Sequence, residues 1–197
     1  MKILTISDQE EKYLWDYYKP GHLDGIDLIL SAGDLDPRYL RFLVTMARCP
    51  LLYVHGNHDK CYEVITPDGC DCVEDQIFVY RGVRILGLGG SVRYSPGEHQ
   101  FTQREMEIRC WKAGWKIAKH KGFDILLTHS PAYGLGDDQS SLCHTGFKAF
   151  VDLLDQYEPK YMVHGHVHLN YGFRIPRWRE YGETKILNAC GRYVFEY

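Results

Sequence analysis

The sequence lacks the features of membrane, fibrous and disordered proteins. No apolar run approaches the roughly 20 residues that span a bilayer, and the 197 residues hold no internal repeat or low-complexity stretch. Hydrophobic residues make up 45% of the chain and charged residues 25%, a balance typical of globular proteins. The first six residues are apolar only briefly before Asp8, which predicts a strand and not a signal peptide. We therefore expect a soluble, cytoplasmic protein with a single domain over residues 1–197.

An excess of basic residues is missing too. The formal net charge is −3, which gives no basic footprint for long-range attraction to a phosphate backbone and argues against a nucleic-acid partner. The seven cysteines are an odd number and lack zinc-finger spacing. Free thiols in a reducing compartment are therefore predicted in place of a disulfide framework. The oligomeric state is left open by the sequence.

The sequence does contain five short polar blocks, each directly after an apolar run that predicts a strand. These runs cover residues 3–6, 28–30, 51–54, 125–127 and 161–163. The blocks that follow them are Asp8-Gln9-Glu10, Gly33-Asp34, Gly56-Asn57-His58-Asp59, Thr128-His129 and Gly165-His166-Val167-His168. Open α/β sheets collect reactive groups beyond the carboxyl ends of their strands, so residues scattered along the chain are expected to converge there.

The remaining pattern predicts an α/β fold with two sheets packed face to face and helices outside. Strands alternate with helices to about residue 164, and short strands alone follow at 171–175, 184–187 and 193–197. Residues 75–80 and 83–88 are expected to form a hairpin. The longest helix is predicted over residues 101–121, because Thr102 and Glu105 form a capping-box pattern. Its buried stripe is predicted from helical spacing to be Ile108, Trp111, Trp115 and Ala118.

Each polar block alone has an ordinary explanation. Paired carboxylates cap helices, Gly-Asp marks turns, and a single histidine serves as a hydrogen-bonded loop residue. Gathered at one sheet edge, three carboxylates and several imidazoles would be too costly to bury unless cations neutralise them. Imidazole and carboxylate ligands suit Mn, Fe and Zn. The blocks together therefore predict a site for two divalent metal ions.

The order of these blocks resembles that of the calcineurin-like metallophosphoesterases, over residues 8–168. The resemblance implies a four-layer αββα sandwich. It also implies that Asp8, Glu10 and His168 bind one metal ion. Asn57, His129 and His166 would bind the other, and Asp34 would bridge the two. His58 would act beside the leaving group without binding metal.

The resemblance further implies a dinuclear metal-dependent phosphoesterase. A hydroxide that bridges the metals would attack phosphorus in line, the metals and Asn57 would stabilise the developing charge, and His58 would protonate the leaving group. The substrate is expected to be a phosphodiester or phosphomonoester, with a small phosphodiester favoured by the short chain. The alternative is a scaffold or binding module that keeps the fold and lacks the chemistry.

Two positions depart from the family pattern. Glu10 stands where the family usually has histidine. It would either remain a ligand, which makes the site more negative and favours Mn or Fe over Zn, or turn away and leave the first site impaired. Pro37 stands where many members have an aspartate that pairs with the catalytic histidine. Asp36 is then expected to cap the helix that begins at Pro37, and Asp59 is left as the alternative partner of His58.

Two segments near the blocks could take part in binding. Arg93 could reach a substrate phosphate, or it could be an ordinary exposed loop arginine. Residues 134–147 could form a lid over the site, with His144 either contacting substrate or serving as a plain loop residue.

Overall fold

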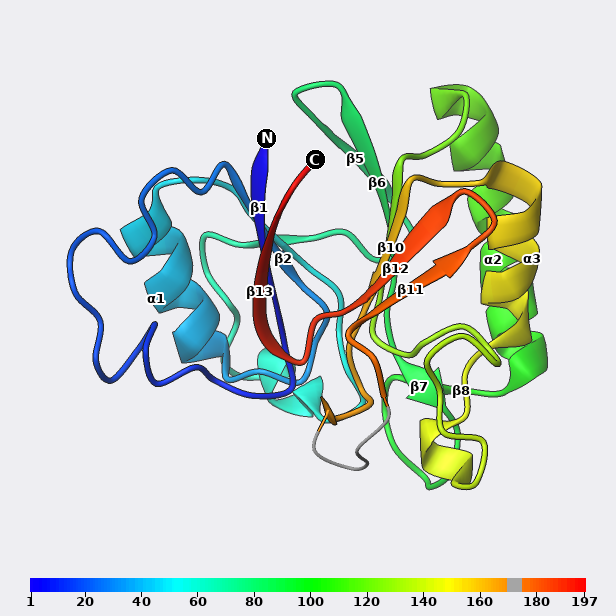
Figure 1. Ribbon diagram of the computed structural model, residues 1–197. Coiled ribbons are helices and arrows are strands. Elements are labelled where there is room, and N and C mark those ends of the chain that lie inside the picture. Colours follow the sequence, from blue (N-terminus) through cyan, green and yellow to red (C-terminus); the bar gives the residue numbers. More distant parts are fainter. Residues whose placement is uncertain (170–174) are drawn as a thin grey trace.

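The computed structural model describes residues 1–169 and 175–197, and these form four layers (Figure 1). Two β-sheets pack face to face, α1 (Pro37–Ala47) covers one of them, and α2 (Gln103–His120) and α3 (Lys148–Tyr157) cover the other. The predicted α/β class and αββα layering are confirmed.

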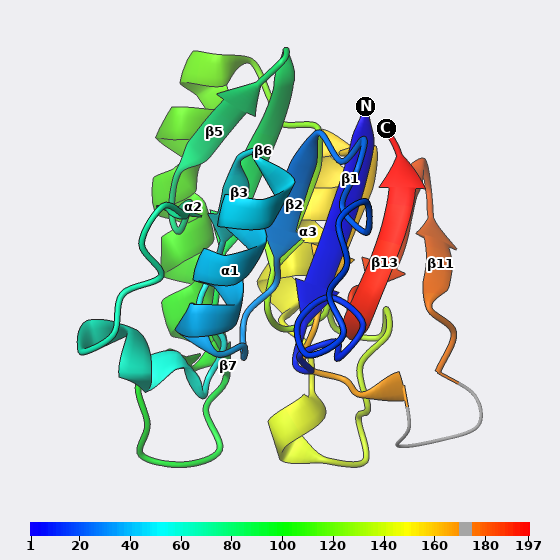
Figure 2. The same ribbon diagram turned by 90° about the vertical axis from the view of Figure 1, so that its left-hand side faces the viewer.

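The first sheet has the strand order β13-β1-β2-β3-β4 within the described residues. Its strands are β1 (Lys2–Ser7), β2 (Leu28–Ser31), β3 (Leu51–Tyr53), β4 (Asp71–Cys72) and β13 (Gly191–Glu196). The strands β1 to β4 run parallel, and β13 is antiparallel to β1. The carboxyl ends of four strands therefore meet at one edge, at the end of the molecule opposite to the two chain termini (Figure 2).

The second sheet has the order β11-β12-β10-β9-β6-β5 within the described residues. Its strands are β5 (Ile77–Tyr80), β6 (Val83–Leu88), β9 (Ile125–Thr128), β10 (Tyr161–His164), β11 (Trp178–Tyr181) and β12 (Thr184–Asn188). The central strands β6, β9, β10 and β12 are parallel, while β5 and β11 are antiparallel edge strands. The hairpin β5–β6 and the strands near residues 184 and 193 are confirmed. The strand predicted at 171–175 falls almost wholly outside the described residues.

Smaller elements connect the two sheets and the helices. A short parallel pair is formed by β7 (Ser91–Val92) and β8 (Gln100–Phe101). Two 3₁₀ turns, η1 (Asp59–Glu63) and η2 (Leu142–His144), follow β3 and β9.

Three apolar clusters hold the layers together. The inner cluster lies between the sheets and contains Leu28, Leu52, Ile85, Ile125 and Val163. A second cluster fills the space between α1 and the first sheet, and a third fills that between α2, α3 and the second sheet. Because these clusters cover both faces of each sheet, the central strands are largely buried and mostly apolar, with a few buried polar residues such as Thr5 and Thr128.

The helix α2 begins as predicted but buries a different face. The side chain of Thr102 accepts from the backbone N–H of Glu105, and the Glu105 carboxylate accepts from that of Thr102, so the capping box is present. The predicted buried stripe is wrong. Trp111 and Trp115 are 72% and 78% exposed, and Ile108 is 45% exposed. The buried residues of α2 are Met106, Cys110, Ala113 and Ile117.

Both stripes on α2 have helical spacing, so periodicity alone could not choose between them. Contact with the second sheet makes the choice, because Met106 and Ile117 pack in the apolar cluster between α2, α3 and that sheet. Along residues 1–169 and 175–197, no helix combines the length and the apolar character that crossing a membrane requires.

Candidate metal centre

The polar blocks meet where the parallel strands of both sheets end. Asp8 follows β1, Asp34 follows β2, and Asn57 and His58 follow β3. His129 follows β9 of the second sheet, and His166 and His168 follow β10. A cavity of about 190 Å³ at this edge is lined by Asp8, Asp34, Asn57, His58, Tyr94, Cys143, His144, His166 and His168. Because the strand ends of both sheets meet at this edge, residues that are far apart in the sequence lie together there.

The backbone turns sharply at three of the blocks. Asp8, Asp34 and His166 have φ values of 63°, 57° and 68°, in the left-handed region that non-glycine residues rarely adopt. Glycines permit the close approach of the loops. A Cβ on Gly56 would lie 2.7 Å from the backbone nitrogen of Asp34, and a Cβ on Gly165 would lie 2.6 Å from Asp8 Oδ2. The motif glycines are therefore required by the contact between loops.

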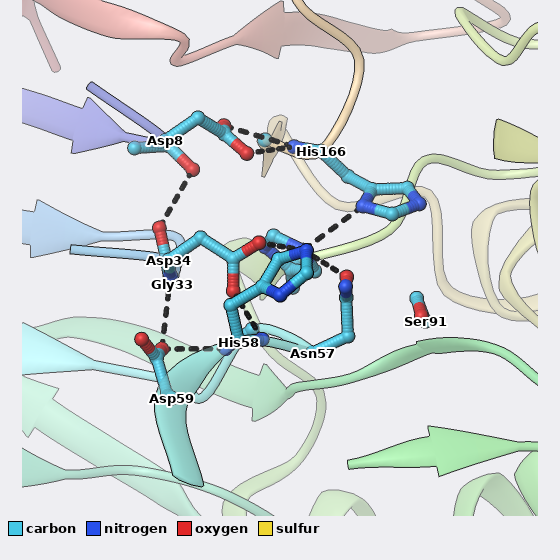
Figure 3. Close-up of polar contacts among 12 residues, drawn as sticks. Asp8, Gly33, Asp34, Asn57, His58, Asp59, Ser91 and His166 are labelled. Atoms are coloured by element: carbon cyan, nitrogen blue, oxygen red, sulfur yellow. Dashed lines mark hydrogen bonds and ion pairs between the residues drawn. The ribbon is translucent and has the colours of Figure 1, made fainter. Parts of the chain in front are cut away.

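One half of the predicted centre is assembled around the buried His129. Its neighbours Asp34, Asn57 and His166 are labelled in Figure 3. The Nδ1 of His129 lies 2.7 Å from the carbonyl oxygen of Ala32, which makes Nδ1 the donor and turns Nε2 to the cavity. That Nε2 lies 3.0 Å from Asn57 Oδ1, 3.1 Å from His166 Nδ1 and 3.4 Å from Asp34 Oδ2. Ligand atoms of Asp34, His129 and His166 all lie within 4.8 Å of one another.

The chemistry of this donor set fits a divalent cation. Several oxygen and nitrogen atoms with lone pairs lie close together, and a single proton on His129 can form hydrogen bonds with only some of them at a time. Burial disfavours the charged form of His129, but the charge of Asp34 and a hydrogen bond to it raise its pKa to about 9. Burial lowers the pKa of His166 to about 3. In the protein without metal the proton on His129 offsets the carboxylate charge, and a cation bound there would replace it.

The two aspartates of the centre differ in their electrostatics. Burial raises the pKa of Asp8, and this outweighs the attraction of His129. Burial acts the same way on Asp34, but the charge of His129 and hydrogen bonds from His129 and the His58 backbone leave its pKa well below the usual range. Asp34, placed between the loops of both sheets, is thus the carboxylate held most firmly in its ionised form.

The other half of the predicted centre is arranged differently around Asp8. The Asp8 carboxylate accepts from the backbone N–H of His166 at 2.9 Å and 3.1 Å. The Glu10 carboxylate accepts from the backbone N–H of Asp36 at 2.8 Å. It is Gln9 whose side-chain amide lies 3.2 Å from His168 Nδ1. Asp8 and His168 therefore line the cavity, whereas the Glu10 carboxylate is hydrogen-bonded to the loop after β2.

His58 lines the cavity, and in the described parts of the chain no ion pair to its imidazole is formed. Its backbone N–H donates to Asp34 Oδ1 at 2.8 Å. Asp36 caps α1 by accepting from the backbone N–H of Arg38 at 2.8 Å and also pairs with the Arg38 guanidinium, so its predicted capping role is confirmed.

Asp59 is not the partner of His58, which corrects the sequence-based alternative. Its side chain is 2% exposed and turns back into the loops, where Oδ2 accepts from the backbone N–H of Gly56 at 2.7 Å and of Asp34 at 2.9 Å. Burial and the nearby charge of Asp34 raise the pKa of Asp59 to about 6. The residue instead ties the loop after β2 to the loop after β3.

Two residues at the cavity were not singled out by the sequence, although Cys143 lies within the segment 134–147 that was predicted to form a lid. The Tyr94 hydroxyl accepts from Asn57 Nδ2 at 3.0 Å, and the Cys143 carbonyl oxygen lies 2.5 Å from His166 Nε2. Tyr94 lies in the loop after β7 and Cys143 lies in η2, and the positions of both depend on the rest of the fold. His144 lines the cavity, which keeps its predicted contact with substrate open. Arg93 instead pairs with Glu105 at 3.0 Å, so it is the structural loop arginine.

A second group of ligand-type atoms, from His55, Glu74 and His99, lies nearby. The rings of His55 and His99 stack with centroids 4.4 Å apart and planes 3° apart, so their lone pairs lie in two parallel planes and do not converge on one point. Glu74 lies 3.4 Å from His55 Nδ1 and 4.0 Å from Arg109. This geometry is that of an ion-pair network and not of a second metal site.

The fold is an αββα sandwich, and the donor set at its strand ends is a candidate metal centre. The chain belongs to the calcineurin-like phosphoesterase family, whose model matches residues 7–170.

Relatives of known sequence and structure are consistent with that family. The chain is 30% identical to UPF0046 protein C25E10.12 of Caenorhabditis elegans over 137 residues, 67% of this chain and 44% of that protein. It is 25% identical to UPF0046 protein K07C11.7 of the same organism over 221 residues, 96% of this chain and 69% of that protein. Its fold matches TT1561 of Thermus thermophilus with a TM-score of 0.63 at 20% identity, covering 96% and 89% of the two chains. The chain thus spans less than half the length of the first of these relatives.

Proposed function

We propose that the protein is a dinuclear metal-dependent phosphoesterase that hydrolyses a small phosphodiester or phosphomonoester. The observation that supports this most is the convergence of Asp34, Asn57, His129 and His166 within contact distance at one end of the sheets, beside a cavity that also holds Asp8 and His168. Bound divalent ions would supply an activated water and positive charge for the phosphoryl oxygens.

The residues of the chain have distinct roles in this proposal. Asp34, His129, His166 and Asn57 would hold one ion, and Asp8 and His168, with Asp34 shared, would hold the other. The amide nitrogen of Asn57 faces the Tyr94 hydroxyl and is placed to donate to a phosphoryl oxygen. His58 would donate a proton to the leaving group. Because no ion pair among the described residues holds its imidazole in place, although the charge of the nearby Asp34 acts on it, we propose that substrates with good leaving groups are hydrolysed best.

The metal preference follows from the charge and hardness of the donors. Asp8 and Asp34 are carboxylates at the cavity, and Glu10 adds a third negative charge nearby through its contact with the Asp36 loop. Hard oxygen donors favour Mn or Fe over Zn. The small cavity of about 190 Å³ supports a small substrate over a nucleic-acid strand. All seven cysteines lie in the described residues and are free, which supports a cytoplasmic compartment.

One observation supports the alternative of a binding module without turnover. The Glu10 carboxylate accepts from the backbone N–H of Asp36, so the side chain that stands in place of the family's usual histidine ligand is engaged elsewhere. A protein with one well-formed ion site would bind phosphate-like ligands yet lack the second charge needed for fast hydrolysis.

Turnover of bis-p-nitrophenyl phosphate, with metal content measured on the same sample, tests the proposal. The purified protein restored with Mn(II) is expected to turn over, to exceed the rate with Zn(II), and to lose activity in His129→Ala and Asp34→Asn. Glu10→His, which restores the family pattern, is expected to raise the affinity for the ion held by Asp8 and His168. No turnover with one bound ion, and turnover gained in Glu10→His, would establish the binding module in its place.

A further inference from the structure

The helical layer carries an apolar surface that the fold leaves uncovered. Trp111 and Trp115, one turn apart on α2, are 72% and 78% exposed. They border a groove between α2 and α3, which lie side by side on the outer face of the second sheet (Figure 1). Adjacent exposed apolar side chains of this size are characteristic of interaction sites. The groove shares no lining residue with the cavity of the metal centre.

The groove has room for a bulky occupant. Its volume is about 490 Å³, and small residues, Gly114, Ala118 and Ala149, line it. A Cβ on Gly114 would meet no atom of the surrounding chain within 4 Å. A glycine inside a helix costs about 1 kcal/mol relative to alanine, and no close approach within the chain requires one here. Gly114 therefore leaves open space in the groove at a cost to the helix.

The charged residues that line the groove indicate the kind of partner it would bind. Among the described residues that line it, the charged ones are Glu107 of α2 and Asp152 of α3, both acidic. Tryptophan rings attract cations through their π faces and are the residues most often found as binding hot spots. An occupant with apolar side chains flanked by lysine or arginine would satisfy both the rings and the carboxylates.

We propose that the α2–α3 groove binds a basic amphipathic helix of a partner protein. Two adjacent helices present a groove into which a third helix packs, with anchors on one face, and Trp111 and Trp115 at i and i+4 match that spacing. A second copy of this chain fits less well. An isologous contact brings the same patch from both sides, so Glu107 and Asp152 would face their own equivalents.

Fluorescence polarisation with two labelled 18-residue peptides tests the proposal. Both have leucine at helical i, i+3, i+4 and i+7 spacing, and the remaining positions are lysine in one peptide and glutamate in the other. At about 0.15 M salt, where surface charges are largely screened beyond about 8 Å, the lysine peptide is expected to bind at least tenfold more tightly. Trp111→Ser with Trp115→Ser should weaken that binding at least tenfold. Tyr17→Ser, which alters a side chain that is 67% exposed elsewhere, should leave it unchanged.

Three further variants distinguish binding in the groove from nonspecific binding. Glu107→Lys with Asp152→Lys is expected to reverse the preference, so that the glutamate peptide binds more tightly. Gly114→Leu is expected to fill the groove and abolish binding, while Gly114→Ala raises the melting temperature. Every variant should keep the metal content of the parent protein, which separates this result from that of the phosphoesterase assay.

Three outcomes would overturn the proposal. Equal binding of the two peptides would remove the charge argument, and unchanged binding in the tryptophan double variant would place the contact elsewhere. A dimer in sedimentation that dissociates in the same double variant would identify a second copy of the chain as the occupant.

Discussion

Replacing Asp59 by alanine is expected to destabilise the protein and to loosen the metal centre together. The buried Asp59 carboxylate accepts from the backbone N–H groups of Gly56 and Asp34 at 2.7 Å and 2.9 Å. Alanine leaves both donors buried or half-buried without a partner, at about 1–3 kcal/mol each. The expected loss is therefore about 2–6 kcal/mol, a large part of the roughly 5–15 kcal/mol typical of a domain.

Asparagine at the same position provides the matched comparison. Both hydrogen bonds end on one oxygen, Oδ2. An amide oxygen has two lone pairs and can accept both. Asp59→Asn is therefore expected to lose at most about 1.5 kcal/mol, the order of one charge-assisted contribution. Asp59→Ala should also bind Mn(II) more weakly than Asp59→Asn, because Asp34 loses its anchor.

Urea denaturation in the presence of a chelator measures the stability difference, and calorimetric titration with Mn(II) measures the affinities. Asp16→Ala, at an exposed aspartate in the loop after β1, controls for the loss of a negative charge. Equal destabilisation by alanine and asparagine, within about 0.5 kcal/mol, would refute the reasoning, because the shared acceptor oxygen would then carry no stability.

Three other predictions rest on single residues. His129, whose pKa is raised to about 9, is protonated at about pH 7.5 without metal and must be neutral to bind one. Mn(II) affinity should therefore rise about tenfold per pH unit from about pH 7 to 9, with about one proton released per ion in calorimetry across buffers; a pH-independent affinity would contradict this. Gly165→Ala places a Cβ 2.8 Å from Ser7 Cβ and should lower the melting temperature by about 2–4 °C for each kcal/mol of strain; an unchanged melting curve would show that the loops can part freely. Thr102→Ala removes the cap that accepts from Glu105 and should cost about 1 kcal/mol in chemical denaturation, whereas Thr102→Ser should cost far less.

The candidate site was largely predictable because its residues follow strands. An apolar run followed by Gly-Asp or Gly-Asn-His identifies a strand and the loop after it, and parallel strands carry such loops to one edge. Side-chain partners within that edge were not predictable. Asp59 stands next to His58 in the sequence yet bonds to Gly56 and Asp34. The direction of a side chain in a loop depends on the neighbouring loop, which comes from another part of the chain.

The strict alternation of strands and helices was not borne out, because the described residues between β1 and β2 form no helix. The sequence by itself determined the strands that precede the polar blocks, the capping of α1 by Asp36 and of α2 by Thr102, and the residue types that gather at the strand ends. These are local properties, set by residues a few positions apart. Only the tertiary structure decided which stripe of α2 is buried, because Met106 and Trp111 both satisfy the helical period and contact with the second sheet selects the first. It also decided that Glu10 bonds to the backbone of Asp36, since that contact joins two loops brought together by parallel pairing of β1 and β2.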